Sequence, residues 1–382
     1  MRLATTIVLT ALLAGFTARP GAAQGDRAAP AWDPEGAAKY LDDRMDIWFA
    51  KAKKLRTGQT TTACISCHTT VPYVMARPAL RRAMQAGAAT PLEARIVEDA
   101  ARRVENFDAN ELIYEGSKKT GSRGTEAVIY AMILASADAA ENRRQPSRAT
   151  RQAFAQLWQT QRPDGAWDWL DFGLEPFESV DATYQGAALA ALAVGIAPGA
   201  PDEAASGMEK LRGYLKQQYS SQSLYNRIWA LLASTRSKDL LTPAQRQALI
   251  EEIRSRQRDD GGWALETLGG WTWSKAEAPF RAPGTRDAAL LAKSDGYATG
   301  LVVYTLRQAG LPAGQAAVSG GLQWLRSNQR DVAVGEQAWH AWRAHSLNFD
   351  REQGGEKGEP WRRMFMSDAA TAFAALALAA SE

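Results

Sequence analysis

The sequence Cys64-Ile65-Ser66-Cys67-His68 contains both cysteines of the 382-residue chain. Two thiols separated by two residues can each form a thioether with one of the two vinyl groups of a single haem. An imidazole that follows directly can reach the iron from the same side of the macrocycle. The residue types and their spacing therefore predict a covalently bound haem c, with Cys64, Cys67 and His68 as the cofactor-binding residues and His68 as the iron ligand.

Two other kinds of site fit the same pentapeptide, which resembles the haem-attachment site of c-type cytochromes. Cys64 and Cys67 could form a disulfide, either structural or redox-active. The two thiols and His68 could instead hold zinc together with a distant fourth ligand. Haem is favoured over a disulfide because a simple bridge does not need His68.

The N-terminus predicts export from the cytoplasm. Arg2 is followed by an apolar run over residues 3–16 and by small residues that end at Ala23. This pattern is typical of a secretory signal peptide over residues 1–23, with an uncleaved anchor as the alternative. We expect residues 24–382 to form one domain in the periplasm or outside the cell, where haem is attached. No apolar run long enough for a transmembrane span follows the signal.

Composition excludes several classes of protein. The chain is 46% hydrophobic and 23% charged, which is typical of a folded protein and not of a disordered one. A net charge of +3 gives no general attraction to nucleic acid. Two cysteines cannot make a disulfide scaffold, so the core must come from hydrophobic burial.

Two kinds of helix alternate along the chain, separated by turns rich in Gly and Pro. One kind is amphipathic and is predicted over residues 34–54, 91–107, 146–160, 201–219, 241–257 and 312–329. The other kind is apolar on nearly every side and is predicted over residues 68–84, 125–137, 181–195, 223–234, 294–310 and 367–380. A helix that is apolar all round must be buried by its neighbours. We therefore expect an all-α fold, an (α/α)6 toroid with six inner and six outer helices.

A short motif recurs at the ends of the outer helices. The segment 161–167 (QRPDGAW) matches 257–263 (QRDDGGW), and Gln329-Arg330-Asp331 followed by Trp339 forms a degenerate third copy. These copies resemble the QW repeats of squalene–hopene cyclases and the related terpenoid cyclase and prenyltransferase toroids. The resemblance covers most of residues 145–380 and implies the toroid fold rather than an activity.

The chain departs from the catalytic motifs of those toroids. Class II terpene cyclases protonate their substrate with an Asp-x-Asp-Asp motif, and the corresponding residues 178–183 contain the single aspartate Asp181, which we expect to cap a helix. The acids nearest the inner-helix starts are Glu126, Glu178, Asp181, Asp295 and Asp368, with the last two also expected as caps. The cysteine that a prenyltransferase zinc site needs on its late helices is missing.

The haem motif precedes the first inner helix, so it should lie at the mouth of the ring. In a closed ring the first inner helix adjoins the last, which brings His68 close to Ser367. A sixth iron ligand is then expected among Met364, Met366, His340 and His345, with Met366 and His345 preferred.

Eight of the 13 tryptophans fall in the links that meet at this mouth. They either cover a flat apolar macrocycle or only pack the loops onto the ring. The eight are Trp167, Trp169, Trp263, Trp271, Trp273, Trp339, Trp342 and Trp361.

The sequence as a whole favours an exported c-type haem protein that acts in electron transfer or in redox or ligand sensing. Its partner would be a redox protein or a small apolar ligand. The alternative is a terpenoid cyclase-like or polyisoprenoid-binding protein, in which Cys64 and Cys67 form a disulfide or a metal site.

Overall fold

Helices in pairs make up most of the structure, which is a computed structural model. It describes residues 31–199, 205–271, 288–334, 337–348 and 360–380. The predicted signal peptide over residues 1–23 and Trp273 lie outside the described residues.

The outer helices confirm the amphipathic set predicted from the sequence. They are α1 (Pro34–Lys51), α3 (Pro91–Glu105), α5 (Arg148–Gln159), α7 (Ala205–Gln218), α9 (Pro243–Ser255) and α12 (Ala316–Asn328). Local chemistry fixes where several of them begin. Thr90 and Thr242 each form a capping box directly before a proline at the first helical position, where proline has no amide to leave unbonded.

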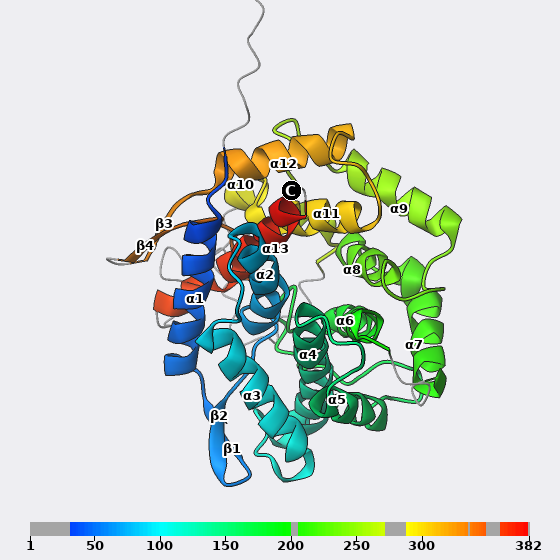
Figure 1. The fold of residues 1–382 in the computed structure, drawn as a ribbon. Coiled ribbons are helices and arrows are strands. Elements are labelled where there is room, and N and C mark those ends of the chain that lie inside the picture. The colour runs from blue at the N-terminus through cyan, green and yellow to red at the C-terminus, as the bar shows by residue number, and fades with distance from the viewer. Residues whose placement is uncertain (1–30, 200–204, 272–287, 335–336, 349–359, 381–382) are drawn as a thin grey trace, which may run out of the picture.

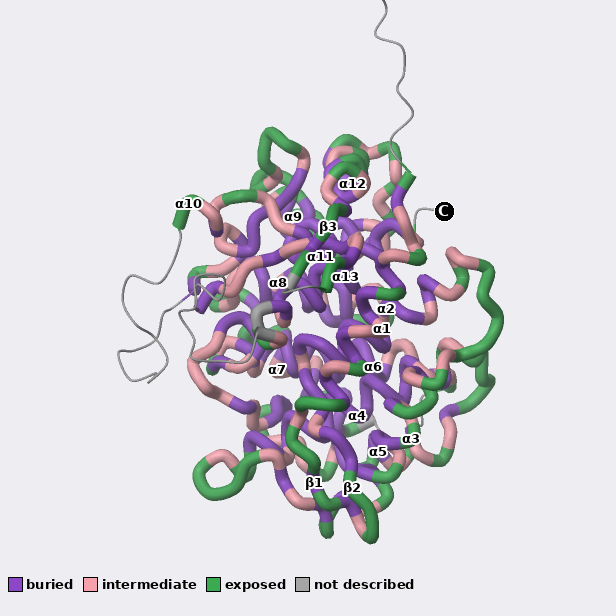
Figure 2. The backbone as a smooth tube through the Cα atoms, turned by 90° about the vertical axis from the view of Figure 1, so that its left-hand side faces the viewer, coloured by how far each residue is buried: buried purple, intermediate pink, exposed green. Residues whose placement is uncertain are grey.

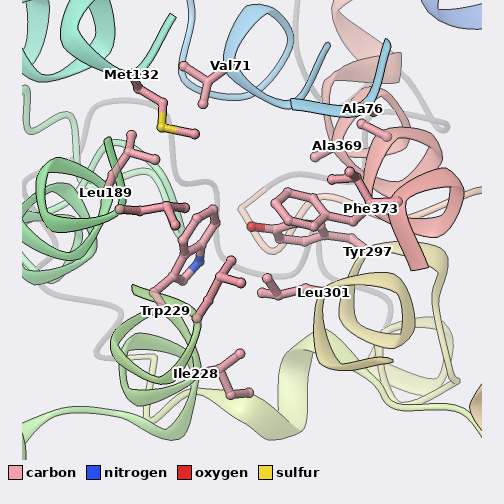
Figure 3. Packing of buried hydrophobic residues seen from close by; sticks show 14 of the residues in the cluster. Val71, Ala76, Met132, Leu189, Ile228, Trp229, Tyr297, Leu301, Ala369 and Phe373 are labelled. Atoms are coloured by element: carbon pink, nitrogen blue, oxygen red, sulfur yellow. The ribbon is translucent and has the colours of Figure 1, made fainter. Parts of the chain in front are cut away.

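The inner helices lie within this outer layer and are buried on nearly every side. They are α2 (Thr70–Ala83), α4 (Lys119–Ala140), α6 (Ala182–Ile196), α8 (Leu224–Ser234), α11 (Gly296–Gln308) and α13 (Phe365–Ala379). Figure 2 shows their tubes as buried along most of their length. Their apolar side chains meet at the centre of the ring, where Trp229, Tyr297 and Phe373 pack together (Figure 3).

The ring closes between the two ends of the chain. The last inner helix, α13, packs against both α11 and the first inner helix, α2 (Figure 1). The outer helix α1 also contacts α13 and the strand β4 (Gln337–Ala341). The predicted (α/α)6 toroid is therefore confirmed, and with it the meeting of the first and last inner helices.

The repeated Gln…Trp motif joins the outer helix that carries it to the next outer helix. Gln257 Nε2 donates to the carbonyl of Gly261 in its own turn and to that of Ala317 in α12. Trp263 Nε1 donates back to the carbonyl of Ile253 in α9. Gly261 has φ +87° and a Cβ there would lie 2.8 Å from a backbone oxygen of α12, so only glycine fits this turn.

The third copy of the motif ends at Trp342 and not at Trp339. Trp342 Nε1 donates to the carbonyl of Leu325, four residues before Gln329, as Trp263 Nε1 donates to a carbonyl four residues before Gln257. Trp339 instead donates to Asp43. The assignment from sequence was wrong because an antiparallel hairpin of β3 (Arg330–Val334) and β4 lies between the two halves of this copy.

A second hairpin also differs from the prediction. The first outer helix ends at Lys51, before the predicted end at residue 54, and the strands β1 (Lys54–Thr57) and β2 (Thr60–Ala63) follow it. A short helix, α10 (Ala288–Leu291), and five 3₁₀ turns complete the described elements: Phe107–Ala109, Gly116–Lys118, Tyr219–Ser221, Leu265–Leu268 and Pro360–Met364.

Only one of three predicted aspartate caps is formed. Asp295 accepts from the backbone amides of Tyr297 and Ala298 at the start of α11. Asp181 precedes α6, but its side chain makes no capping hydrogen bond. Asp368 lies inside α13, which begins at Phe365, and accepts hydrogen bonds from three other side chains instead.

None of the helices in the described part of the chain combines the length and apolarity that crossing a membrane requires.

Candidate haem-binding site

The Cys-x-x-Cys-His segment lies between β2 and α2 and is held there by its own residues. The amide of Cys64 donates to the carbonyl of Lys53, next to the first hairpin. Ser66 Oγ accepts from the amides of Thr69 and Thr70 and so bonds the first free amides of α2. The serine inside the motif therefore fixes how the segment enters the helix.

A cavity lies beside all three motif residues. It has about 590 Å³ of empty space, part of which opens to solvent. Only about 90 Å³ of this space admits a water-sized molecule, which is well below the range of about 300–1,000 Å³ that small-molecule sites occupy. Besides residues 64–68 its lining comprises Trp48, Ile113, Tyr114, Thr125, Glu126, Ile129, Tyr130, Leu170 and Glu178.

Hydrogen bonds determine which nitrogen of His68 carries the proton. Thr69 Oγ1 donates its one proton to Asp368 Oδ2 at 2.7 Å. It can therefore only accept from His68 Nδ1, which lies 3.0 Å away. The proton of the neutral ring is thus on Nδ1 and the lone pair is on Nε2, the arrangement in which a histidine binds a metal through Nε2.

Asp368 is buried and ionically paired, so it holds this relay rigidly. Its side chain is 1% exposed and accepts from Arg44 Nε at 2.6 Å and from the hydroxyl of Tyr40 at 2.7 Å. The carboxylate raises the pKa of Arg44 against the opposing effect of burial. Burial, with the neighbouring carboxylate of Asp368, raises the pKa of Tyr40 well above its ordinary value, so Tyr40 stays a donor.

Aromatic rings fix the plane of the His68 imidazole. Phe365 stacks on it with ring centroids 4.0 Å apart, and Trp48 meets it edge-on at 5.5 Å. The indole of Trp48 also donates to the carbonyl of Cys64 at 2.6 Å. The first and last helices of the ring therefore both position this histidine.

Cys64 and Cys67 are free thiols and are partly buried. Burial, reinforced by Glu126 and Glu178, raises the pKa of Cys64 to about 12. Burial also raises the pKa of Cys67 well above its ordinary value. A redox-active pair and a zinc ligand both work as thiolate, so this environment disfavours those two alternatives and leaves a structural disulfide open.

The described residues also contain no group of three or more His, Cys, Asp or Glu side chains that could hold a metal ion. Cys64, Cys67 and His68 are therefore not brought together as a zinc site in the described part of the chain. Haem makes a different demand, since each sulfur would bond a separate edge of the macrocycle and only His68 would face the iron. The His68 tautomer fits that demand, whereas the cavity does not fit a haem in this conformation, because about 90 Å³ of it is accessible and its described lining has two acids and no Lys or Arg.

The predicted sixth ligands do not line the cavity. Met364 and Met366 are buried at the start of α13, and His345 is partly buried in the link before it. His340 lies on β4, where its Nδ1 is 3.1 Å from Asp33 Oδ2, at the outer layer. Ring closure thus brings α13 to His68 as expected, where Phe365 stacks on the imidazole. Met366 and His345 stay predictions as ligands.

Most of the tryptophans in the links pack the ring. Trp167, Trp263 and Trp342 are buried in the repeat turns and bond helix carbonyls. Trp361 contacts Trp48 near the motif. Trp169 lines a smaller neighbouring cavity together with Cys67.

Sequence reasoning missed the cavity wall that α4 provides. Glu126 and Tyr130 are 2% and 1% exposed and lie four residues apart, hence on one face of the helix. Arg103 of α3, itself fully buried, donates from Nη2 to Glu126 Oε1. The sequence feature that could have indicated this wall is Glu126, the one acid in the otherwise largely apolar stretch 125–137.

A scan against models of known protein families and a search of curated proteins found no match to this chain. Among solved structures, the chain is similar to a variant of an unsaturated glucuronyl hydrolase described together with the oligosaccharide dGlcA-Glc-Rha-Glc. The two are 12% identical over 88% of this chain and 95% of that chain, with a TM-score of 0.50. That protein is an α6/α6 toroid, so the similarity supports the toroid fold and nothing finer.

Proposed function

We propose that this chain is an exported c-type haem protein built on an (α/α)6 toroid, with haem attached through Cys64 and Cys67 and its iron bound by His68 Nε2. The observation that carries the proposal is the relay from Asp368 through Thr69 to His68. Cys-x-x-Cys-His spacing can occur by chance. A histidine of that motif whose proton is fixed on Nδ1 by a hydrogen-bond relay to a buried carboxylate is much more specific.

The residues around the motif have separate tasks in this proposal. Thr69 and Asp368 hold the imidazole in the ligating tautomer, and Phe365 and Trp48 fix its plane. Haem, when bound, supplies one-electron redox chemistry and a coordination position for a second ligand. If Met366 or His345 fills that position the protein transfers electrons, and if neither does the protein binds a small ligand.

The polar α4 wall favours the second role, ligand binding, because Glu126 and Tyr130 line the same cavity as His68. A redox partner or a small ligand is accordingly the partner we propose, in the periplasm or outside the cell.

The test is expression of the full chain in a bacterial host that attaches haem c. We expect a red protein whose haem survives denaturing electrophoresis and gives a reduced-minus-oxidised spectrum. The double variant Cys64→Ser/Cys67→Ser should lose the denaturation-resistant haem, whereas His340→Ala, a matched histidine outside the cavity, should keep it. A colourless wild-type protein would overturn the proposal.

A further inference from the structure

A second, larger cavity lies at the opposite end of the inner helices from the Cys-x-x-Cys-His segment. The segment precedes α2, whereas this cavity is lined by the C-terminal parts of α2, α4, α6, α8 and α11, which surround the centre of the ring (Figure 1). About 260 Å³ of its space admits a water-sized molecule, against about 90 Å³ beside the motif, and it opens to solvent. A small molecule can therefore enter this end of the ring without any helix moving.

Most of the wall of this second cavity is apolar. Ten of its 15 lining residues carry no polar side-chain group, among them Leu192 and Ile196 of α6 and Leu232 of α8. Apolar surface that faces water is stabilised when another apolar group covers it. A hydrocarbon chain is thus the kind of group that this wall favours.

The charges of the second cavity all have one sign. Its lining contains Arg82 and Arg236 and no Asp or Glu among the described residues. The exposed guanidinium of Arg82 forms no ion pair or hydrogen bond within the described chain, and Arg236 Nη2 donates only to the neutral Gln308, at 2.8 Å. Two cations without a countercharge favour an anion, and the planar guanidinium matches a carboxylate.

Tyr304 of α11 adds a neutral donor beside the two arginines. Burial raises the pKa of Tyr304, and the charges of Arg236 and Arg82 oppose that rise, so both cations lie near the phenol. The hydroxyl stays protonated, and within the described chain it has no hydrogen-bond partner. It can therefore donate to an anion that the arginines attract.

The ends of the inner helices limit how much negative charge this mouth accepts. The C-terminal carbonyls of a helix carry a partial negative charge, and five inner helices end here. They offset part of the field of Arg82 and Arg236, so one negative charge suits the mouth better than two.

We propose that this second cavity binds an aliphatic monocarboxylate, with its carboxylate at Arg82, Arg236 and Tyr304 and its chain against the apolar wall. The site lies apart from His68, so the inference goes beyond the proposed function and does not depend on bound haem.

Isothermal titration calorimetry of the full chain tests the class of ligand, with octanoate, octan-1-ol and acetate as probes. Octanoate should bind at least tenfold more tightly than the other two, because octan-1-ol lacks the charge and acetate lacks the chain. Equal binding of octan-1-ol would remove the role of the arginines, and equal binding of acetate would remove that of the wall. Either result would overturn the inference.

Substitutions then locate the binding. Arg82→Gln and Arg236→Gln should each weaken octanoate binding about tenfold, which corresponds to about 1.4 kcal/mol, and should leave octan-1-ol binding unchanged. Tyr304→Phe should weaken octanoate binding about fivefold. Arg254→Gln is the matched control, because Arg254 lies in the last turn of α9, outside the cavity. Unchanged octanoate affinity in both cavity arginine variants would overturn the inference.

Filling the cavity tests the wall without touching the charges. Ala139 of α4 is exposed and lines the cavity, so Ala139→Phe should weaken octanoate and octan-1-ol alike while the unfolding midpoint in urea stays the same. The variant Cys64→Ser/Cys67→Ser, which cannot attach haem, should bind octanoate as the wild type does. A loss of affinity in that variant would place octanoate at the motif and overturn the inference, whereas a colourless wild type that binds octanoate would overturn the proposed function alone.

Discussion

At the scale of single residues, the environment of the two thiols differs most from that of ordinary cysteines. Cys64 has a pKa of about 12, against the usual thiol value of 9.0, because it is buried near Glu126 and Glu178. The folded chain therefore binds a proton more tightly at this sulfur than the unfolded chain does. The stability that this shift contributes is fully present below pH 9.0, the usual thiol pKa. It is lost as the pH rises from there through about 12, the pKa of Cys64 in the folded chain.

This shift predicts slow alkylation of the haem-free protein. At pH 8 the fraction of Cys64 present as thiolate is therefore roughly a thousandth of the fraction in an ordinary cysteine. Iodoacetamide should therefore modify Cys64 at least 100-fold more slowly in the folded chain than in urea, as measured by mass spectrometry in a Cys67→Ser background. Equal rates in the folded and unfolded chains would contradict the assigned environment.

The relay to His68 predicts a second effect at this scale. Thr69→Val removes the acceptor of the Nδ1 proton, and losing such a partner typically weakens metal binding by about 10–100-fold. In the haem-loaded protein, the pH at which acid displaces His68 should rise by about one to two units in absorbance titrations. Thr371→Val, which alters a buried threonine bonded to Trp342 instead, should leave that pH unchanged.

At the scale of helices and turns, the repeated Gln…Trp turn predicts a strong demand for glycine. Gly261→Ala would force a side chain into φ +87° and against α12, 2.8 Å from a carbonyl oxygen. We expect a loss of about 2–3 kcal/mol in the free energy of unfolding. Gly270→Ala is the control, because its Cβ would meet nothing within 4 Å. Equal unfolding midpoints for the two variants would mean that the turn tolerates a side chain.

The sequence predicted these helices well because each kind of helix has its own pattern. Outer helices are amphipathic and inner helices are apolar all round, and this contrast can be recognised in one sequence without an alignment. The two hairpins were missed because four- and five-residue strands carry too little alternation to stand out. Trp342 was misassigned for the same reason, since the second hairpin separates it from Gln329.

The site was predictable only in part. The predicted haem attachment depends on the local spacing of Cys64, Cys67 and His68, and it stays a prediction. The relay from Asp368 joins residues 299 positions apart, and no spacing rule reveals such a pair. Ring closure did indicate that α13 would reach His68, yet it could not say that Phe365 would stack on the imidazole.

At the scale of the whole molecule, a buried ion pair joins the two ends of the ring. Arg44 of α1 and Asp368 of α13 are 2% and 1% exposed. Asp368→Asn leaves the guanidinium without a countercharge and should cost about 3–5 kcal/mol. The double variant Arg44→Met/Asp368→Asn should recover part of that loss, because no buried charge remains.

Urea unfolding followed by tryptophan fluorescence measures both variants. The exposed pair Lys39–Asp43 serves as the control, and Lys39→Met should change the free energy of unfolding by less than about 1 kcal/mol. A double variant as unstable as Asp368→Asn alone would show that the loss comes from the other hydrogen bonds of Asp368.

The closure of the ring by α13 has a consequence for the order of events during biosynthesis. Residues 64–68 leave the ribosome about 300 residues before α13 does, and until then nothing covers the imidazole from that side. The sulfurs are therefore most reactive in the incomplete chain, and any enzyme that modifies them has its best access before the last helix docks. In a chain that folds first, α13 would already cover this side of the motif.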